Sequence, residues 1–258
     1  MDRHRAEALT RALVDDDPRL DLIAAAIAGA DSSAPSIDEL VAELDELASG
    51  APPSAGGLIR HVFANLGFTG NTSRYYHPSN SLLHKVLHRR IGNPLSLATV
   101  AAEISRRAGG TLCVVGFPGH VLIGDDAHPS SWYDPFLGGD PMDLAGCRSL
   151  LARMRPGEAF HPAMVRQASK YEVAQRMLNN LDVAWRQTGD ISRLVSVMEL
   201  RLAFPDAGSG ERRQLAHTLI AAGRPFRAAQ VLEELTAIDP DNGEEYQRIR
   251  HRLLAHAN

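Results

Sequence analysis

The chain has 258 residues and few of the features that mark secreted, membrane or nucleic-acid-binding proteins. It has two cysteines, too few for a disulfide framework. Its net charge of -4 provides no basic face for nucleic acid. No apolar run approaches the roughly 20 residues of a membrane-spanning helix, and the N-terminal sequence lacks the apolar core of a signal peptide. We therefore expect a cytoplasmic protein that binds neither nucleic acid nor a membrane.

Signatures of cofactors, metals and reactive thiols are scarce as well. The sequence contains no Gly-rich phosphate loop and no dinucleotide fingerprint. His84 and His88 are spaced i, i+4, but no third ligand and no zinc-protease glutamate accompany them. Cys113 lies in an apolar run and should be buried and inert. Cys147 stands next to Arg148, which could make its thiol partly reactive, but no base pairs with it. We expect no cofactor and no metal ion.

The spacing of apolar residues predicts an α+β fold with helices at both ends. Residues 1–50 form an N-terminal helical segment, and the Gly- and Pro-rich stretch 49–57 is a loop. Helices are predicted over 58–66 and from a cap at Asn80 or Ser81 to residue 90. A better-defined helix follows, with Asn93 as its cap, Pro94 at its first position and Gly109-Gly110 at its end.

Strands are predicted after that helix. Runs over 111–115, 119–124 and 131–136 are separated by turn residues, which favours a small antiparallel sheet against which the helix packs. Alternation places His120 and Leu122 on one face of the sheet. The strand signals stop near residue 160, so the core is predicted to span residues 58–160.

Residues 165–258 read as pairs of helices with breaks at Gly189 and Gly223. These glycines are 34 residues apart (223−189), a period typical of tetratricopeptide repeats. Two repeats are fewer than such an array needs to stand alone, so the tail should pack against the core.

Three polar residues of the core suggest chemistry. Ser96 lies at a helix start, where backbone N–H groups are unpaired, His120 begins a strand, and Asp134 sits in an apolar run where a charge needs a partner. The three have the order of nucleophile, general base and orienting carboxylate. Each also has a simpler explanation: serine is common in first helical turns, a lone histidine is usually an ordinary core or surface residue, and Asp-Pro often starts a turn.

Several phrases together resemble the SirB family, in its transglutaminase-like type with a tetratricopeptide tail. They are Gly67-Phe68-Thr69-Gly70-Asn71, Tyr75-Tyr76-His77-Pro78-Ser79-Asn80-Ser81, Gly92-Asn93-Pro94-Leu95-Ser96-Leu97, Gly116-Phe117-Pro118-Gly119-His120 and Tyr133-Asp134-Pro135-Phe136. The resemblance implies a papain-like fold with a Cys-His-Asp site whose cysteine starts a helix. Here Ser96 stands at the matching position, with His120 and Asp134 as the other two residues. Candidates for the rim or the oxyanion side are Asn71, Tyr75, Tyr76, Asn80 and Asn93.

Two functions follow from these residues. The first is acyl transfer, or hydrolysis of amide or ester bonds, with Ser96 as nucleophile. The second is a pseudoenzyme that binds a peptide or protein partner in the same cleft, with the helical repeats extending that surface. We favour the second, because a serine hydroxyl needs a well-aligned base where a thiol is already partly ionised. The sequence predicts no particular oligomeric state.

Overall fold

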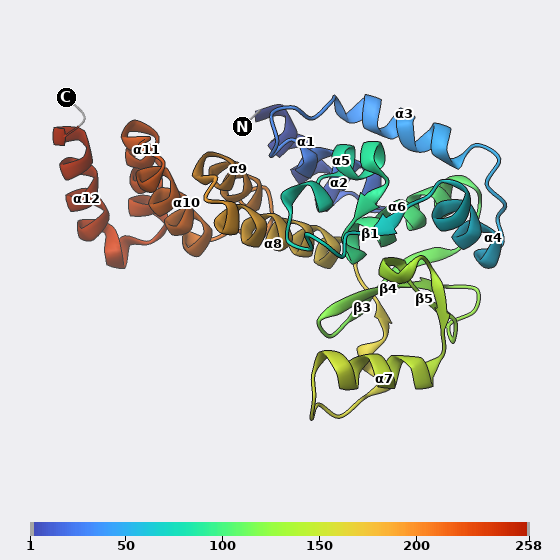
Figure 1. Cartoon of the computed structure of the whole chain (residues 1–258). Coiled ribbons are helices and arrows are strands. Elements are labelled where there is room, and N and C mark those ends of the chain that lie inside the picture. The colour runs from blue at the N-terminus through green and yellow to red at the C-terminus, as the bar shows by residue number, and fades with distance from the viewer. Residues whose placement is uncertain (1–2, 257–258) are drawn as a thin grey trace.

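The computed structural model describes residues 3–256, and Figure 1 shows helices at both ends of the chain around a small sheet. The N-terminal helices are α1 (Arg3–Val14), α2 (Leu20–Ala28) and α3 (Ile37–Ala48). α2 is buried along most of its length because its sequence is almost entirely apolar. The outermost residues of the predicted terminal segments, 1–2 and 257–258, lie outside the described residues.

The helix predicted from Pro94 is confirmed as α6 (Pro94–Arg107). The Asn93 side chain accepts a hydrogen bond from the Ser96 N–H, and the Ser96 hydroxyl accepts one from the Asn93 N–H. This reciprocal pairing satisfies backbone donors that the first helical turn leaves open. At the other end, Gly109 has a φ of 71°, which a residue with a side chain rarely adopts.

The segment before α6 is mostly helical. α4 (Ala55–Ile59) continues into a π-helical turn (Arg60–Asn65), so this helix begins at residue 55 and not at residue 58. A short 3-10 helix (Pro78–Asn80) precedes α5 (Leu83–Arg89), whose cap position is Leu82 instead of Asn80 or Ser81. β1 (Thr69–Gly70) and β2 (Ile91–Gly92) pair in parallel, which was not predicted because two residues are too few to show alternation.

The antiparallel sheet is confirmed, with two additional strands. β3 (Leu112–Phe117), β4 (His120–Asp125) and β5 (Trp132–Asp134) are the three predicted strands. The unpredicted strands are β6 (Asp140–Met142) and β7 (Arg166–Gln167), and the order is β6-β5-β4-β3-β7. The prediction that strands stop near residue 160 was therefore wrong, because β7 pairs with β3 from beyond that point.

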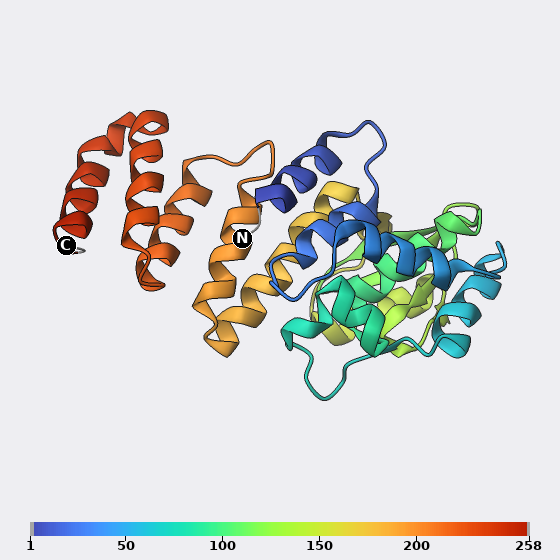
Figure 2. The same cartoon turned by 90° about the horizontal axis from the view of Figure 1, so that it is seen from above.

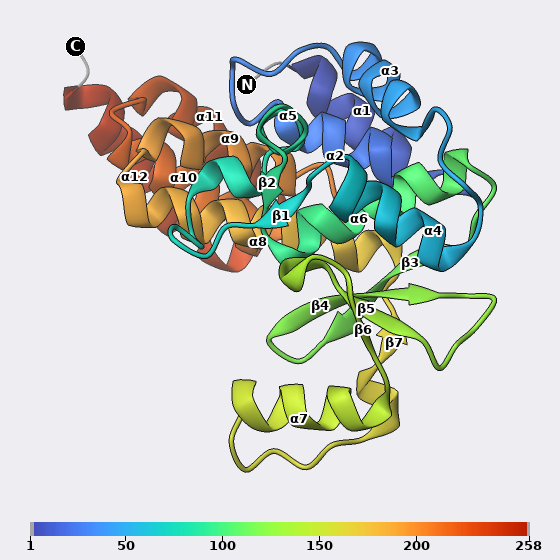
Figure 3. The ribbon, with the colours of Figure 1, turned by 45° about the vertical axis from the view of Figure 1, so that its right-hand side comes forward.

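Alternation along the strands divides the core into two apolar layers. Val114, Val121 and Ile123 join the cluster that includes α6, whereas Val115 and Leu122 belong to a second cluster. The second cluster is completed by residues of α7 (Leu144–Met154). The sheet therefore lies between α6 and α7, as Figure 3 shows.

The tail consists of helices that each contact the next. They are α8 (Lys170–Thr188), α9 (Ile191–Arg201), α10 (Ser209–Ala221), α11 (Pro225–Ile238) and α12 (Gly243–His256). Figures 1 and 2 show them stacked in a row that leads away from the core. The predicted breaks at Gly189 and Gly223 are confirmed by positive φ values of 72° and 67°. The tail is docked through α8, which contacts α2 and α6.

No helix within residues 3–256 is long and apolar enough to cross a membrane.

Candidate functional site

Ser96 lies in the first turn of α6, where its hydroxyl is surrounded by backbone groups. The hydroxyl donates to the carbonyl oxygen of Asn80 at 2.7 Å and accepts from the Asn93 N–H at 3.0 Å. The side chain is buried. Both hydrogen-bonding functions of this hydroxyl are therefore used in joining the helix start to the loop before α5.

Gly92 makes room for this arrangement. A Cβ atom at residue 92 would lie 2.5 Å from Ser96 Oγ and 3.1 Å from Leu97 Cγ. No side chain fits there without moving the start of α6. The Gly-Asn-Pro-Leu-Ser sequence is thus explained by the close packing of Gly92 against Ser96 and by the capping of α6.

His120 and Asp134 form a buried pair at one end of the sheet. Nε2 of His120 lies 3.1 Å from both carboxylate oxygens of Asp134. Oδ1 of Asp134 also accepts the Phe136 N–H at 2.9 Å, so the carboxylate is fixed by the 3-10 turn at Pro135. This satisfies the need of Asp134 for a partner, and it orients the imidazole.

The second ring nitrogen of His120 remains available. Nδ1 makes no hydrogen bond to any residue of the described range 3–256. If Nε2 donates its proton to Asp134, the basic lone pair is on Nδ1. The pair thus has the geometry of a general base and its orienting carboxylate.

The structure brings His120 and Asp134 together but does not join Ser96 to them. α6 packs against β4 and against the 3-10 turn that follows Asp134. Within the described residues, however, the partners of the Ser96 hydroxyl are backbone groups of Asn80 and Asn93, and no hydrogen bond connects it to His120.

The three asparagines support the loop from within. Asn80 is fully buried, and its amide donates to the carbonyls of Arg74 and Tyr75. Asn71 donates to Oδ1 of Asn80, while Asn93 donates to the Ser81 hydroxyl. Their amides therefore hold the loop of residues 71–81 together and join it to the start of α6.

Tyr75 and Tyr76 are exposed, and together with the half-buried Phe136 they form a surface that we call the aromatic ledge. The Tyr75 ring meets those of Tyr76 and Phe136 edge to face, with centroids 5.0 and 5.6 Å apart. Gly70 permits this, because a Cβ there would lie 2.4 Å from the Phe136 ring. The ledge adjoins Asp134 through the Asp134-Pro135-Phe136 turn.

Arg176 was missed by the sequence analysis. It comes from α8, in the tail, and its Nη2 donates to the His120 carbonyl at 2.8 Å. Burial lowers the pKa of Arg176, although Tyr75 and Glu172 act in the opposite direction. Nothing in the sequence near residue 176 signals this contact, because it depends on how the tail docks.

Neither cysteine provides an alternative nucleophile. Cys113 and Cys147 are both buried, and burial raises the pKa of Cys113 to about 12 and that of Cys147 to about 11. The expectation that Cys147 is partly reactive was wrong, since its side chain packs between α7 and the sheet. In residues 3–256 no three histidine, cysteine or acidic side chains gather as metal ligands.

Comparison with known proteins connects this fold to a family. The sequence model of the Transglutaminase-like superfamily matches residues 32–179. A UPF0162 protein of Pseudomonas aeruginosa is 35% identical over 191 residues, covering 69% of each chain. A UPF0162 protein of Xylella fastidiosa (strain Temecula1) is 37% identical over 162 residues, and the match covers 59% of this chain and 56% of that relative.

A more distant similarity extends to eukaryotes. Human F-box only protein 21 is 27% identical over 213 residues, which cover 74% of this chain and 33% of that protein. The chain spans little more than half the length of the Xylella relatives, and no solved structure matches it significantly. The matched residues include the α6 start, the sheet and the first half of α8. The chain therefore belongs to the transglutaminase-like superfamily, in which its bacterial relatives are UPF0162 proteins.

Proposed function

We propose that this protein is a non-catalytic member of the superfamily that binds a peptide or protein partner, in a binding or regulatory role. The observation that carries the proposal is the hydrogen bond from the Ser96 hydroxyl to the Asn80 carbonyl, at 2.7 Å. A nucleophilic serine needs its hydroxyl proton directed at a base. Turning Ser96 toward His120 would break this bond and the pairing with Asn93 that caps α6.

The aromatic ledge is the proposed contact surface for the partner. Tyr75 and Tyr76 present large rings to solvent beside the His120–Asp134 pair. Burial raises the pKa of the Tyr75 hydroxyl, so it remains a neutral donor at physiological pH. Tyrosines of this kind combine apolar contact area with a hydrogen-bonding tip, which suits peptide recognition.

The same proposal includes the SirB type of the protein, the type of its helical repeats and its cellular location. The motif phrases around Asn71, Ser96 and His120 support a SirB-type protein, and the 34-residue spacing of Gly189 and Gly223 supports tetratricopeptide-like repeats that extend the binding surface. The low cysteine content supports a cytoplasmic location. Because the F-box relatives are matched over a third of their length, nothing of their activity is carried over.

Labelling with a serine-reactive fluorophosphonate tests the proposal. We expect the unaltered protein to react no faster than Ser96→Ala, because the hydroxyl is committed to Asn80. Ser149, an exposed serine on α7, provides the matched control Ser149→Ala. Labelling that disappears in Ser96→Ala and in His120→Ala, but persists in Ser149→Ala, would overturn the non-catalytic function.

The alternative is an acyltransferase or an amide or ester hydrolase with Ser96 as nucleophile. The observation in its favour is the intact His120–Asp134 pair, whose Nδ1 has no partner among residues 3–256. In this case Ser96 gives up its bond to Asn80 when substrate binds, and His120 takes the hydroxyl proton. The labelling pattern that overturns the first proposal supports this one.

A further inference from the structure

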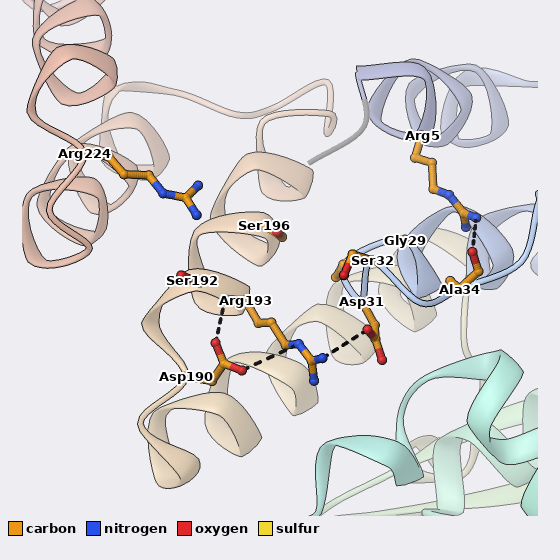
Figure 4. A pocket seen from close by; sticks show the side chains of 11 residues that line it. Arg5, Gly29, Asp31, Ser32, Ala34, Asp190, Ser192, Arg193, Ser196 and Arg224 are labelled. Carbon is orange, nitrogen blue, oxygen red and sulfur yellow. Dashed lines mark hydrogen bonds and ion pairs between the residues drawn. The ribbon is translucent and has the colours of Figure 1, made fainter.

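A polar cavity of about 580 Å³ lies between the N-terminal helices and the tail, and Figure 4 shows it at close range. We propose that it binds a small anionic ligand, one that carries a carboxylate or phosphate group, with Arg224 as the anchoring cation. The volume is within the usual range for small-molecule sites. The site is separate from His120 and Asp134, neither of which lines the cavity.

Arg224 is the unneutralised charge of this cavity. Its exposed guanidinium makes no hydrogen bond or ion pair with any residue of the described chain. It is the N-cap residue of α11, and in Figure 4 its side chain extends toward Ser196 on α9. A guanidinium presents N–H donors in a fork that fits two oxygens of a carboxylate or phosphate.

Hydroxyl groups stand near this cation. Ser192 and Ser196 line the same cavity from α9. Within residues 3–256 neither hydroxyl forms a hydrogen bond, so both can donate to an anion. A cation with adjacent free hydroxyl donors is a suitable environment for an oxyanion.

The acidic groups of the cavity are already paired. Arg193 Nη2 lies 3.2 Å from Asp31 Oδ1, and Arg193 Nε lies 3.6 Å from Asp190 Oδ2. Asp31 is buried and also has Lys85 Nζ at 3.9 Å. The two carboxylates therefore add little repulsion toward an incoming anion, while the charge of Arg224 remains uncompensated.

The opposite wall of the cavity is rigid. Arg5 is buried and donates to the carbonyls of Ala25 and Ala34, which fixes the turn after α2. Gly29 leaves space for it, because a Cβ there would lie 1.9 Å from Arg5 Cδ. An anion bound between this wall and α11 would connect the tail to the N-terminal helices, so its binding should raise the thermal stability of the whole chain.

Calorimetric titration of the full chain with inorganic phosphate and, separately, with succinate tests the proposal at low ionic strength. We expect saturable binding of at least one probe, with Arg224→Gln weakening it about tenfold or more, since a charge-assisted hydrogen bond is lost. Arg60→Gln is the matched control, because Arg60 is also exposed and without a side-chain partner in residues 3–256. Ser196→Ala, which leaves the charge in place, should weaken binding about threefold.

Binding of phosphate alone assigns a phosphate-bearing ligand, and binding of succinate alone assigns a carboxylate. The same probe should raise the melting temperature of the unaltered protein but not that of Arg224→Gln. Absence of saturable binding for both probes would overturn the proposal. It would also be overturned if Arg60→Gln weakened binding as much as Arg224→Gln.

Discussion

Ser96 lies in the first turn of α6 and His120 is the first residue of β4, and these two elements pack against each other. The polar atoms of the two side chains are used differently. The Ser96 hydroxyl is donor to Asn80 and acceptor from Asn93. In the His120 ring, Nε2 is hydrogen-bonded to Asp134, whereas Nδ1 has no partner in the described residues. The Ser96 hydroxyl is therefore occupied by hydrogen bonds to the backbone, whereas His120 keeps one ring nitrogen that can accept a proton.

The largest loss of stability is expected for a substitution at Asn80, which supports the loop at the start of α6. Asn80→Ala removes a buried amide that donates to two carbonyls and accepts from Asn71, leaving those groups unpaired. We expect a loss of about 3 kcal/mol in the free energy of unfolding, measured with urea. Ser79→Ala, at the neighbouring half-buried residue, should change it by less than about 0.5 kcal/mol. Equal losses in the two variants would show that Asn80 does not support the loop.

On the sheet side, His120→Ala should destabilise by about 1–3 kcal/mol because Asp134 loses its buried partner. His128→Ala is the matched control, since His128 also pairs with an aspartate, Asp125, but is 75% exposed. That change should cost at most about 1 kcal/mol. If the two losses in urea unfolding were the same, burial would not be what makes the His120 pair strong.

His84 provides a third buried or polar-paired imidazole for comparison, because its protonation should make the free energy of unfolding depend on pH. His84 is buried, and its Nε2 lies 3.6 Å from Asp31 Oδ2, beyond hydrogen-bond distance, so neither ring nitrogen has a hydrogen-bond partner in the described residues. Burial, assisted by Lys85, lowers its pKa from 6.5 to about 4. The unfolded chain therefore takes up a proton as the pH falls below about 6.5, while the folded protein does not until about pH 4. Stability is complete above this window and is lost on acidification through it.

Between pH 7 and pH 5 this linkage should remove about 2 kcal/mol from the free energy of unfolding. His84→Leu should abolish that part of the pH dependence. His88→Leu, on the exposed side of the same helix, should retain it. Urea titrations at the two pH values measure the effect, and an unchanged pH dependence in His84→Leu would refute it.

The parts of this structure that follow from the sequence are those specified by neighbouring residues. α6 was predictable because Asn93, Pro94 and Gly109 mark its ends locally. The strands β3, β4 and β5 were predictable because each is a short apolar or β-branched run bounded by turn residues. The pairing of His120 with Asp134 could be expected because a carboxylate in an apolar run needs a partner.

The remaining features depend on contacts between distant residues. Ser96 donates to a carbonyl 16 residues earlier in the chain, and Arg176 reaches His120 from a helix 56 residues later. β7 is too short to show a pattern and exists because β3 offers it an edge. Such contacts form only when distant segments of the chain pack together, so no local sequence pattern predicts them. They nevertheless determine whether Ser96 and His120 can take part in catalysis.

The alkylation rate of a thiol introduced by Ser96→Cys tests the central claim most directly. Iodoacetamide would be applied at neutral pH, where the native cysteines stay protonated and buried. Ser149→Cys provides an ordinary exposed thiol for reference. We predict that Ser96→Cys reacts no faster than Ser149→Cys, because residue 96 is buried and directed at the Asn80 carbonyl. A much faster reaction that depends on His120 would show a site poised for catalysis and contradict a non-catalytic function.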